Sequence, residues 1–487
     1  MGRIRKDGAI RAVVRAGIEL SRAELGAELE QRLADEFTYR NPQKAKLRRL
    51  GKWTGHIPES IEHLERDDER LVLPRGGAAR IEKIVARFGR ELLYLDRRLD
   101  LPRADFSLGP TARPVELRPS QIEMVEAAVA RETAVIRAAT GSGKTEAALE
   151  IVRRLSRPAL VVVWTSGLVT QWVDRISARF GWPKSRIGVV GGGTARFGDV
   201  TVALQQAIYK RPEEIAERFA VVVMDECQRA SAATYRSLIS RLPARYRIAF
   251  SADERRKDGL EWLIWDNFGP VAAEVSRKEL VRAGALCEVD VVLVPTGLKV
   301  DFLERADPEL RSVVLSQRYS DVSAIVAGDA ERNALAARIA AREARAGRST
   351  IVFCNRIADG QVYDLARRIA IDEGVRCGTM VGGPAARAEY EETKRRLISG
   401  ELRCAVASSA AYQGEDIPRL EVGVVVTPTA GNRQLFEQQV GRLRRTSPGK
   451  TRGTIYVLWD EHVFRSHREN LVDWYGSRLV TVAGEEV

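Results

Sequence analysis

The stretch Ala138-Ala139-Thr140-Gly141-Ser142-Gly143-Lys144-Thr145 decides the fold of this chain. An apolar run at Ala134–Arg137 precedes it and helix-forming residues follow it, which is typical of a strand–loop–helix unit. Small residues in such a loop let backbone N–H groups wrap phosphate oxygens at the positive end of the helix. Lys144 would reach the β- and γ-phosphates, and the Thr145 hydroxyl would ligate Mg²⁺. The stretch predicts a phosphate-binding loop in an α/β fold.

A second apolar run, Phe219–Met224, leads directly into Asp225 and Glu226 about 80 residues downstream. It reads as a buried strand, and ligands of open α/β sheets bind at the carboxyl ends of strands. Asp225 would hold Mg²⁺ through water, and Glu226 would position and deprotonate the attacking water. An isolated Asp-Glu pair is usually a solvated loop, but the phosphate loop upstream favours the catalytic interpretation.

Gln121 lies about 20 residues before the phosphate loop. A side-chain amide can satisfy both the donor and the acceptor on the adenine edge, so this position favours ATP as the nucleotide. The alternative is an ordinary glutamine at a helix start.

Two arginines near the carboxyl end complete the predicted site. Arg442 and Arg445 are three residues apart on an apparent helix, hence on one face, and could be aimed at the γ-phosphate from a second domain. A guanidinium suits the growing negative charge of the transition state. Arg444 should face elsewhere. The alternative is a basic surface helix.

Apolar runs alternate with helical stretches over two regions, which predicts two parallel-sheet α/β halves in tandem. We place them at residues 116–288 and 289–487, after a small α+β accessory domain at residues 1–115. In that domain, Ser21 should cap a helix that runs to about Glu36, and Asn41-Pro42 should stop it. Runs that read as strands are Ala159–Trp164, Val200–Leu204, Tyr246–Phe250, Thr350–Cys354, Arg376–Met380, Arg403–Ala407, Glu421–Val426 and Gly453–Leu458.

Composition narrows the class of protein. The 487 residues carry a net charge of +12 and are 45% hydrophobic, without a run long enough for a bilayer span or a signal peptide. We therefore expect a cytoplasmic protein with a polyanionic partner. The five cysteines show no zinc-ligand spacing. Trp53, in a basic segment, could stack on a base, although such a residue more often belongs to a small domain's core.

The ordered motifs resemble those of superfamily-2 helicases over roughly residues 117–460. Motifs I and II correspond to Ala138–Thr145 and Asp225–Gln228, and motif VI to Gln438–Arg445. Phe268-Gly269-Pro270 and the residues after it are most similar to the branch of the XPB-type and phage recombination helicases. The remaining matches are Trp164-Thr165-Ser166 (Ia), Val202–Gln206 (Ib/Ic), Phe250–Asp253 (III), Val352–Asn355 (IV), and Ala407–Ser409 with Gly414–Pro418 (V).

This resemblance implies two RecA-like domains that close over ATP and Mg²⁺, with nucleic acid across their opposite face. It places Gly414 and Asp416 near the nucleotide. It places Thr165, Ser166, Gln205, Asn355 and Ser408 near the phosphodiester backbone, where small polar groups grip without reading bases.

Three positions depart from the family pattern. Gln228 stands where most relatives carry His or Asp, so an amide would relay nucleotide state, with Gln438 as a candidate partner. Asp253 replaces the usual Thr of motif III, and Arg256-Lys257-Asp258 stands in place of an Arg-Glu-Asp element.

The resemblance implies an ATP-dependent helicase or translocase, on DNA through the branch similarity, with possible protein partners in repair or recombination. A duplex translocase or annealing ATPase that does not separate strands is an alternative. Others are a nucleotide-switched binding module and the motor subunit of a restriction system.

Overall fold

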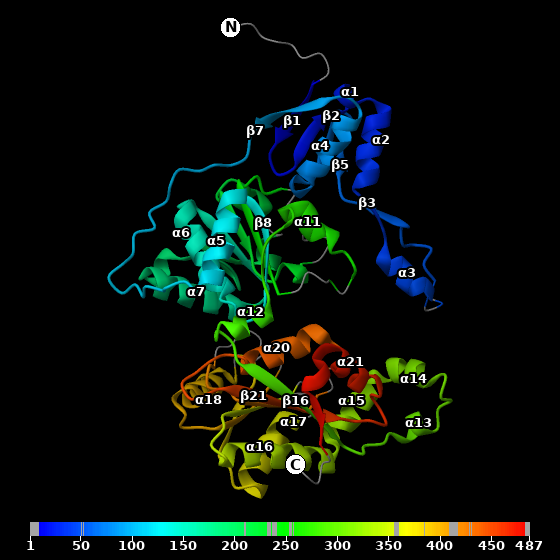
Figure 1. Ribbon diagram of the computed structural model, residues 1–487, viewed down its shortest axis with the longest axis vertical. Helices are drawn as coiled ribbons and strands as arrows, with labels where there is room; N and C mark the ends of the chain where they lie inside the picture. The colour runs from blue at the N-terminus through cyan, green and yellow to red at the C-terminus, as the bar shows by residue number, and fades with distance from the viewer. Residues whose placement is uncertain are drawn as a thin grey trace. The chain divides into compact units, whose positions relative to one another are not determined.

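The computed structural model describes residues 9–49, 51, 53–208, 211–230, 235, 241–252, 256, 258–354, 360–383, 385–408, 417–427, 429 and 431–482. The chain forms two units, Met1–Ser276 and Arg277–Val487. In Figure 1 the first unit runs from blue to green and the second from green to red. No helix within the described residues is long and apolar enough to cross a membrane.

An eight-stranded sheet lies at the centre of the first unit, with Val-rich, largely buried inner strands and an exposed edge strand, Thr194–Arg196. All its pairings are parallel except that between β10 (Gly188–Gly191) and β11 (Thr194–Arg196). Strands that are buried on both faces read as continuous apolar runs, which is why five of these eight strands were predicted from the sequence. In sheet order the strands are β11 (Thr194–Arg196), β10 (Gly188–Gly191), β12 (Val200–Leu204), β9 (Ala159–Val163), β13 (Val221–Met224), β14 (Tyr246–Ser251), β8 (Thr133–Ala138) and β15 (Val271–Val275).

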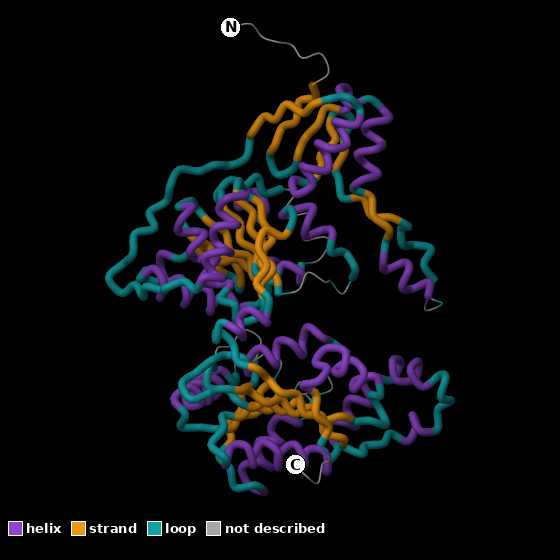
Figure 2. Tube along the Cα trace, viewed as in Figure 1, coloured by secondary structure: helices purple, strands orange, loops and turns teal. Residues whose placement is uncertain are grey.

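Helices connect these strands, and Figure 2 shows them as purple segments flanking the orange strands. The helices are α5 (Pro119–Arg131), α6 (Lys144–Leu155), α7 (Ser166–Phe180), α8 (Gln205–Ile208), α9 (Pro212–Ala216) and α11 (Trp262–Phe268), with 3₁₀ turns at Lys184–Arg186 and Cys227–Arg229.

The second unit repeats this architecture with seven parallel strands. In sheet order they are β18 (Cys377–Met380), β19 (Cys404–Ala407), β17 (Thr350–Phe353), β20 (Val422–Val425), β21 (Arg452–Trp459), β16 (Glu288–Pro295) and β22 (Leu479–Thr481). The helices are α12 (Arg277–Arg282), α13 (Asp301–Glu304), α14 (Arg311–Gln317), α15 (Tyr319–Gly328), α16 (Ala330–Arg345), α17 (Gln361–Arg367), α18 (Arg387–Ser399), α20 (Arg433–Leu443) and α21 (Ser466–Tyr475), with a π-helix at Arg368–Asp372 and a 3₁₀ turn at Gly476–Arg478.

The amino-terminal part of the first unit is a small α+β domain. Its sheet has the order β5 (Glu65–Arg66), β6 (Arg70–Leu73), β2 (Ile18–Ser21), β1 (Ala9–Val14), β7 (Glu91–Asp96). Helices α1 (Arg22–Leu25), α2 (Ala27–Glu36) and α4 (Ala78–Arg87) accompany the sheet, with a 3₁₀ turn at Arg75–Gly77. A separate ribbon of β3 (Thr38–Arg40) and β4 (Ser60–Glu62) carries helix α3 (Pro42–Arg49).

Two details of the predicted first helix are wrong. The Ser21 side chain makes no capping hydrogen bond, and Gly26, with φ of 74°, divides the helix into α1 and α2. A glycine adopts this backbone conformation without steric cost. Pro42 does not stop a helix but begins α3, because proline is compatible with the first turn, where no backbone N–H partner is needed.

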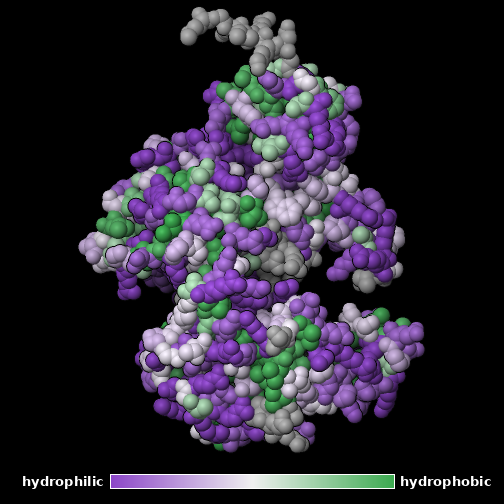
Figure 3. All heavy atoms as spheres, in the orientation of Figure 1, coloured by the Kyte–Doolittle hydropathy of each residue, from purple (hydrophilic) through white to green (hydrophobic). Residues whose placement is uncertain are grey.

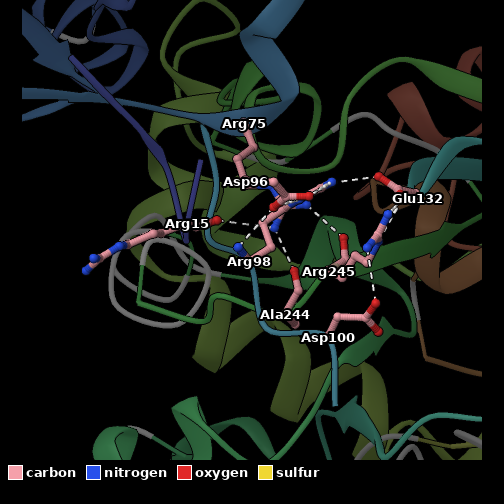
Figure 4. Close-up of polar contacts among 8 residues, drawn as sticks. All are labelled: Arg15, Arg75, Asp96, Arg98, Asp100, Glu132, Ala244 and Arg245. Carbon is pink, nitrogen blue, oxygen red and sulfur yellow. Dashed lines mark hydrogen bonds and ion pairs between the residues drawn. The ribbon is translucent and has the colours of Figure 1, made fainter. Parts of the chain in front are cut away.

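Arginines, of which Arg75 is buried, join this small domain to the α/β part of the same unit (Figure 4). Arg75 donates to the carbonyl oxygens of Ala244 at 2.6 Å and of Arg245 at 2.8 Å. Arg98 and Arg245 both pair with the Glu132 carboxylate, at 2.7 and 2.8 Å. These contacts attach the residues that lead into β14 to the amino-terminal domain.

A second attachment centres on Asp266 in α11, whose side chain is 1% exposed. Tyr39 donates to it at 3.0 Å, His63 Nδ1 lies 2.8 Å from its Oδ2, and Arg80 contacts it as well. The Tyr39 ring also stacks on Trp262 with 3.8 Å between ring centroids. The ribbon β3–β4 is therefore held at its base by the α/β part of the unit.

Candidate nucleotide site

The phosphate loop lies between β8 and α6, as its strand–loop–helix pattern predicted. Gly141 and Gly143 have φ of 87° and 85°, in the left-handed region that favours glycine. A Cβ atom on Gly143 would lie 2.0 Å from the Gln121 amide nitrogen, so this position has no room for a side chain. Lys144 begins α6, and its Nζ donates to the carbonyl oxygen of Ala138 at 3.1 Å.

Asp225 and Glu226 follow β13 and meet the phosphate loop at the carboxyl edge of the sheet. The Nζ of Lys144 lies 3.4 Å from the Glu226 carboxylate. Glu226 has φ of 48°, an uncommon conformation for a residue with a side chain, which turns the chain sharply after the strand. Strained residues of this kind occur at functional sites.

The two carboxylates differ electrostatically. Burial, followed by the neighbouring Glu226 charge, raises the pKa of Asp225 to about 6. Burial also acts to raise the pKa of Glu226, but Lys144 and the Gln228 amide outweigh it, so that this pKa is lowered. Neighbouring titratable groups whose pKa values are pushed apart are typical of acid–base and metal sites.

Sequence reasoning missed two tryptophans that hold Asp225. Trp172 in α7 donates to its Oδ2 at 3.3 Å, and Trp164 donates to its backbone carbonyl at 2.7 Å. Trp164 directly follows β9, the strand next to β13. The sequence does contain a signal for Trp164, because it stands at the carboxyl end of a strand that neighbours β13. An indole N–H in a partly buried position needs a hydrogen-bond acceptor, and the end of β13 offers one.

The Gln228 side chain links the carboxylates to the next strand. Its amide donates to the Glu226 carboxylate, and its carbonyl accepts a 2.6 Å hydrogen bond from the Ser251 hydroxyl at the end of β14. Arg256 donates to the Gln228 backbone carbonyl at 3.3 Å and pairs with Asp258 at 2.6 Å. The amide therefore connects motifs II and III within the first unit, whereas Lys257 and Asp253 lie outside the described residues.

Gln121 is engaged within the protein. Its Oε1 accepts from the Arg118 backbone N–H at 2.8 Å, and its Nε2 donates to the Gly143 carbonyl at 3.3 Å. The residue is 3% exposed. Gln121 thus caps α5 and hydrogen-bonds to the phosphate loop. A contact with adenine would require the amide to break these two hydrogen bonds or to share them with the base.

The remaining predicted residues of the first unit follow strands at the same edge. Thr140 and Ser142 lie in the phosphate loop and Thr145 in the first turn of α6. Thr165 caps α7, accepting from Leu168 N–H at 3.3 Å, and Ser166 is the first residue of that helix. Gln205 follows β12 as the first residue of α8.

In the second unit, Ser408 follows β19, where its Oγ accepts from the Gly382 N–H at 3.4 Å. Arg442 lies in the last turn of α20, but that helix ends at Leu443, so Arg445 is not on its face and instead forms a β-bridge with Leu286. Arg444 turns inward and pairs with Glu437 at 2.9 Å. Asn355, Gly414 and Asp416 lie outside the described residues.

Comparisons with known proteins find similarity to a restriction-enzyme subunit, DNA translocases and DNA helicases. The family model described as "Type III restriction enzyme, res subunit" matches residues 114–255. The DNA 3'-5' translocase XPB2 of Sulfurisphaera tokodaii is 27% identical over 364 residues, 68% of this chain and 79% of that protein. The ATP-dependent DNA helicase uvsW of Enterobacteria phage T4 is 22% identical over 435 residues, 85% of this chain and 82% of that protein.

This chain spans 51% to 64% of the length of three further XPB and Rad25 relatives. Among solved structures, the ATP-dependent Type ISP restriction-modification enzyme LlaBIII bound to DNA matches 76% of this chain and 32% of that chain, with a TM-score of 0.54 and 14% identity. That likeness shows a shared fold, and the predicted architecture of tandem RecA-like parallel-sheet domains is confirmed. The family match and these relatives support the predicted resemblance to superfamily-2 helicases of the branch that contains the XPB-type and phage UvsW-type proteins.

Proposed function

We propose that this protein is an ATP-dependent DNA helicase or translocase. The observation that carries the proposal is the contact of Lys144 with Glu226, beside Asp225, at the carboxyl edge of one parallel sheet. A phosphate-binding lysine, a metal-binding carboxylate and a water-activating carboxylate form the front half of a triphosphate hydrolysis site.

The phosphate loop fits a triphosphate with Mg²⁺. The buried Ser142 hydroxyl has no hydrogen-bond partner within the described part of the chain, so a bound anion would satisfy it. Helix α6 begins at Lys144, so the N–H groups of its first turn are unpaired by the helix and can bind an anion. Mg²⁺, when bound, would neutralise charge on the phosphates, with Thr145 and Asp225 as its protein ligands.

We assign the following roles to the residues of the first unit. Lys144 exchanges its contact with Glu226 for the phosphates, which leaves the Glu226 carboxylate free to accept a proton from water. Gln228 holds that carboxylate in place through its amide. Because the lowered pKa of Glu226 favours its ionised form, the residue is ready to act as a base at neutral pH.

We propose that Arg442 and Arg445 complete the site from the second unit, with Gly414 and Asp416 contributing to nucleotide binding. A guanidinium supplied by another domain to the γ-phosphate couples hydrolysis to domain closure. The two arginines need not share a helix face for this role, since Arg445 is positioned by its β-bridge to Leu286.

We propose DNA as the substrate because the relatives in this branch are named as DNA translocases and helicases. Thr165, Ser166, Gln205, Asn355 and Ser408 are proposed to contact the phosphodiester backbone, which gives binding without sequence preference. The net charge of +12 supports such contacts, whose affinity should fall steeply with salt.

The test is the steady-state ATPase rate with single-stranded, blunt duplex, forked and four-way DNA, and with RNA, using the wild type and Lys144→Ala. DNA-stimulated multiple turnover that Lys144→Ala abolishes supports the proposal. Strand displacement on forked DNA assigns a helicase, and stimulation by duplex without displacement assigns a translocase. A single turnover that no nucleic acid stimulates would refute the motor and leave a nucleotide switch.

A further inference from the structure

The ribbon β3–β4 and helix α3 form a projection from the amino-terminal domain, residues 38–62, which we call the arm. Figure 1 shows α3 extending away from the five-stranded sheet, and Figure 3 shows this region as mainly hydrophilic. Its helix α3 has no buried residue. At its base, by contrast, Tyr39 stacks on Trp262 and donates to Asp266. The arm is thus anchored at one end and open to solvent along its length.

The arm has an uneven charge distribution. Between Thr38 and Pro58 the sequence contains no Asp or Glu and six Lys or Arg residues. Lys44 and Arg48 both pair with Glu59, the first acidic residue after this stretch, at 2.9 and 2.8 Å. The exposed Lys46 and Arg49 form no ion pair with any described residue. Two cations on the arm are therefore available to a phosphate backbone.

Trp53 follows these cations closely in the sequence, four residues after Arg49, and its side chain is 76% exposed. Tryptophan is highly buried on average, so an indole this exposed leaves a ring face open to a partner. Its ring is also held in place: it stacks on His56 with 5.0 Å between ring centroids. A Cβ atom on Gly55 would lie 2.6 Å from the indole, so the ring rests directly on the glycine backbone. This tryptophan is a preformed platform rather than part of a core.

We propose that the arm is a binding site for unpaired nucleotides, with a base stacked on Trp53 and neighbouring phosphates paired with Lys46 and Arg49. Stacking on an aromatic ring is available to every base, and a duplex does not offer an unpaired face. The inference rests on the proposed function, because it assumes a nucleic-acid substrate. It assigns to the amino-terminal domain a contact separate from those proposed along the two sheets.

The test measures equilibrium binding of the full chain, without nucleotide, to a labelled single strand and to a blunt duplex of equal length. Trp53→Ala should weaken single-strand binding about tenfold, and duplex binding less than about twofold. Trp53→Phe should retain most of the affinity. Leu93→Ala, which removes another exposed apolar side chain (65% exposed) from the same domain, should leave both affinities unchanged.

The phosphate contacts have their own measurement. The double variant Lys46→Ala/Arg49→Ala should weaken both DNA forms and reduce the slope of log affinity against log salt by about 1.5 for a single strand. Lys83→Ala, an exposed lysine in α4, provides the control for a general charge effect. An unchanged salt slope in the double variant would overturn the phosphate assignment.

Two results would overturn the stacking assignment. One is that Trp53→Ala binds a single strand as tightly as Leu93→Ala does. The other is that Trp53→Ala loses as much affinity for the duplex as for the single strand. DNA-stimulated ATPase is measured on the same wild-type preparation. If that stimulation is absent, the proposed function fails. If it is present while Trp53→Ala binds normally, only the role of the arm fails.

Discussion

Replacing Gln228 by alanine removes the side chain that joins the Glu226 carboxylate to Ser251. Both ends of this bridge lie in partly or fully buried surroundings, with Gln228 8% and Ser251 0% exposed. The variant leaves Lys144 and Asp225 untouched. It therefore separates the contribution of the bridge from that of phosphate and metal binding.

The structure sets the expected magnitude. A hydrogen bond to a charged group contributes about 1.5–3 kcal/mol, and a neutral one about 0.5–1.5 kcal/mol. Losing the bonds to Glu226 and to Ser251 should thus lower the free energy of unfolding by about 2–4 kcal/mol. Because the Gln228 amide helps to lower the pKa of Glu226, its loss should also raise that pKa. The acid limb set by Glu226, which lies below the limb that Asp225 sets near pH 6, should then move to higher pH.

Urea unfolding and the pH dependence of kcat together check this prediction. In a double-mutant cycle, Gln228→Ala and Ser251→Ala should show a coupling energy of about 0.5–1.5 kcal/mol. Gln31→Ala is the matched control, since Gln31 donates to Asp35 at 2.8 Å but in an exposed position, where the effect should be below about 0.5 kcal/mol. Additive single effects, together with an unmoved acid limb, would show that the bridge does not couple these residues.

Four further expectations concern the same molecule. Since the pKa of Asp225 is raised to about 6, ATPase activity should fall as the pH drops below about 6. Excess Mg²⁺ should shift this acid limb of the pH profile to lower pH, because metal binding favours the ionised carboxylate. An acid limb that Mg²⁺ does not move would contradict a metal-binding role for Asp225. The same raised pKa means that the folded state holds its proton more tightly than the unfolded chain, so this group's contribution to stability is lost as pH rises from about 4 to about 6. Asp266→Ala should lower the free energy of unfolding by about 3 kcal/mol, since it leaves buried polar partners unpaired, and an unchanged urea midpoint would contradict that attachment. Arg442→Ala should reduce kcat by about 10³-fold with ATP binding retained, as measured by ATPase and nucleotide titration, whereas an unaltered kcat would exclude it from the hydrolysis site.

The α/β sheets and the phosphate loop were predictable because each depends on local sequence. A strand buried on both faces must be apolar throughout, and a loop that wraps phosphate must contain small residues, so β12 was expected at Val200–Leu204 and found there. The contacts of Gln228 were not predictable, because its partner Ser251 is brought near only by the pairing of β13 with β14. The break at Gly26 was overlooked because the helical pattern continues on both sides of it.

The anchoring of the arm limits what the arm can contribute to movement. A grip that binds DNA equally well in every nucleotide state shifts no equilibrium, however tight it is, and so cannot drive a step. The arm is fixed to the α/β part of the first unit through Tyr39 and Asp266, and the contacts of its described side chains do not include the residues of the nucleotide site. Trp53 therefore acts as a constant tether, which should extend the time that the protein stays on a single strand. The change in affinity that produces movement must arise from residues that respond to the bound triphosphate. Among these, Gln228 contacts the catalytic Glu226 carboxylate directly, and Ser251 is joined to it through Gln228.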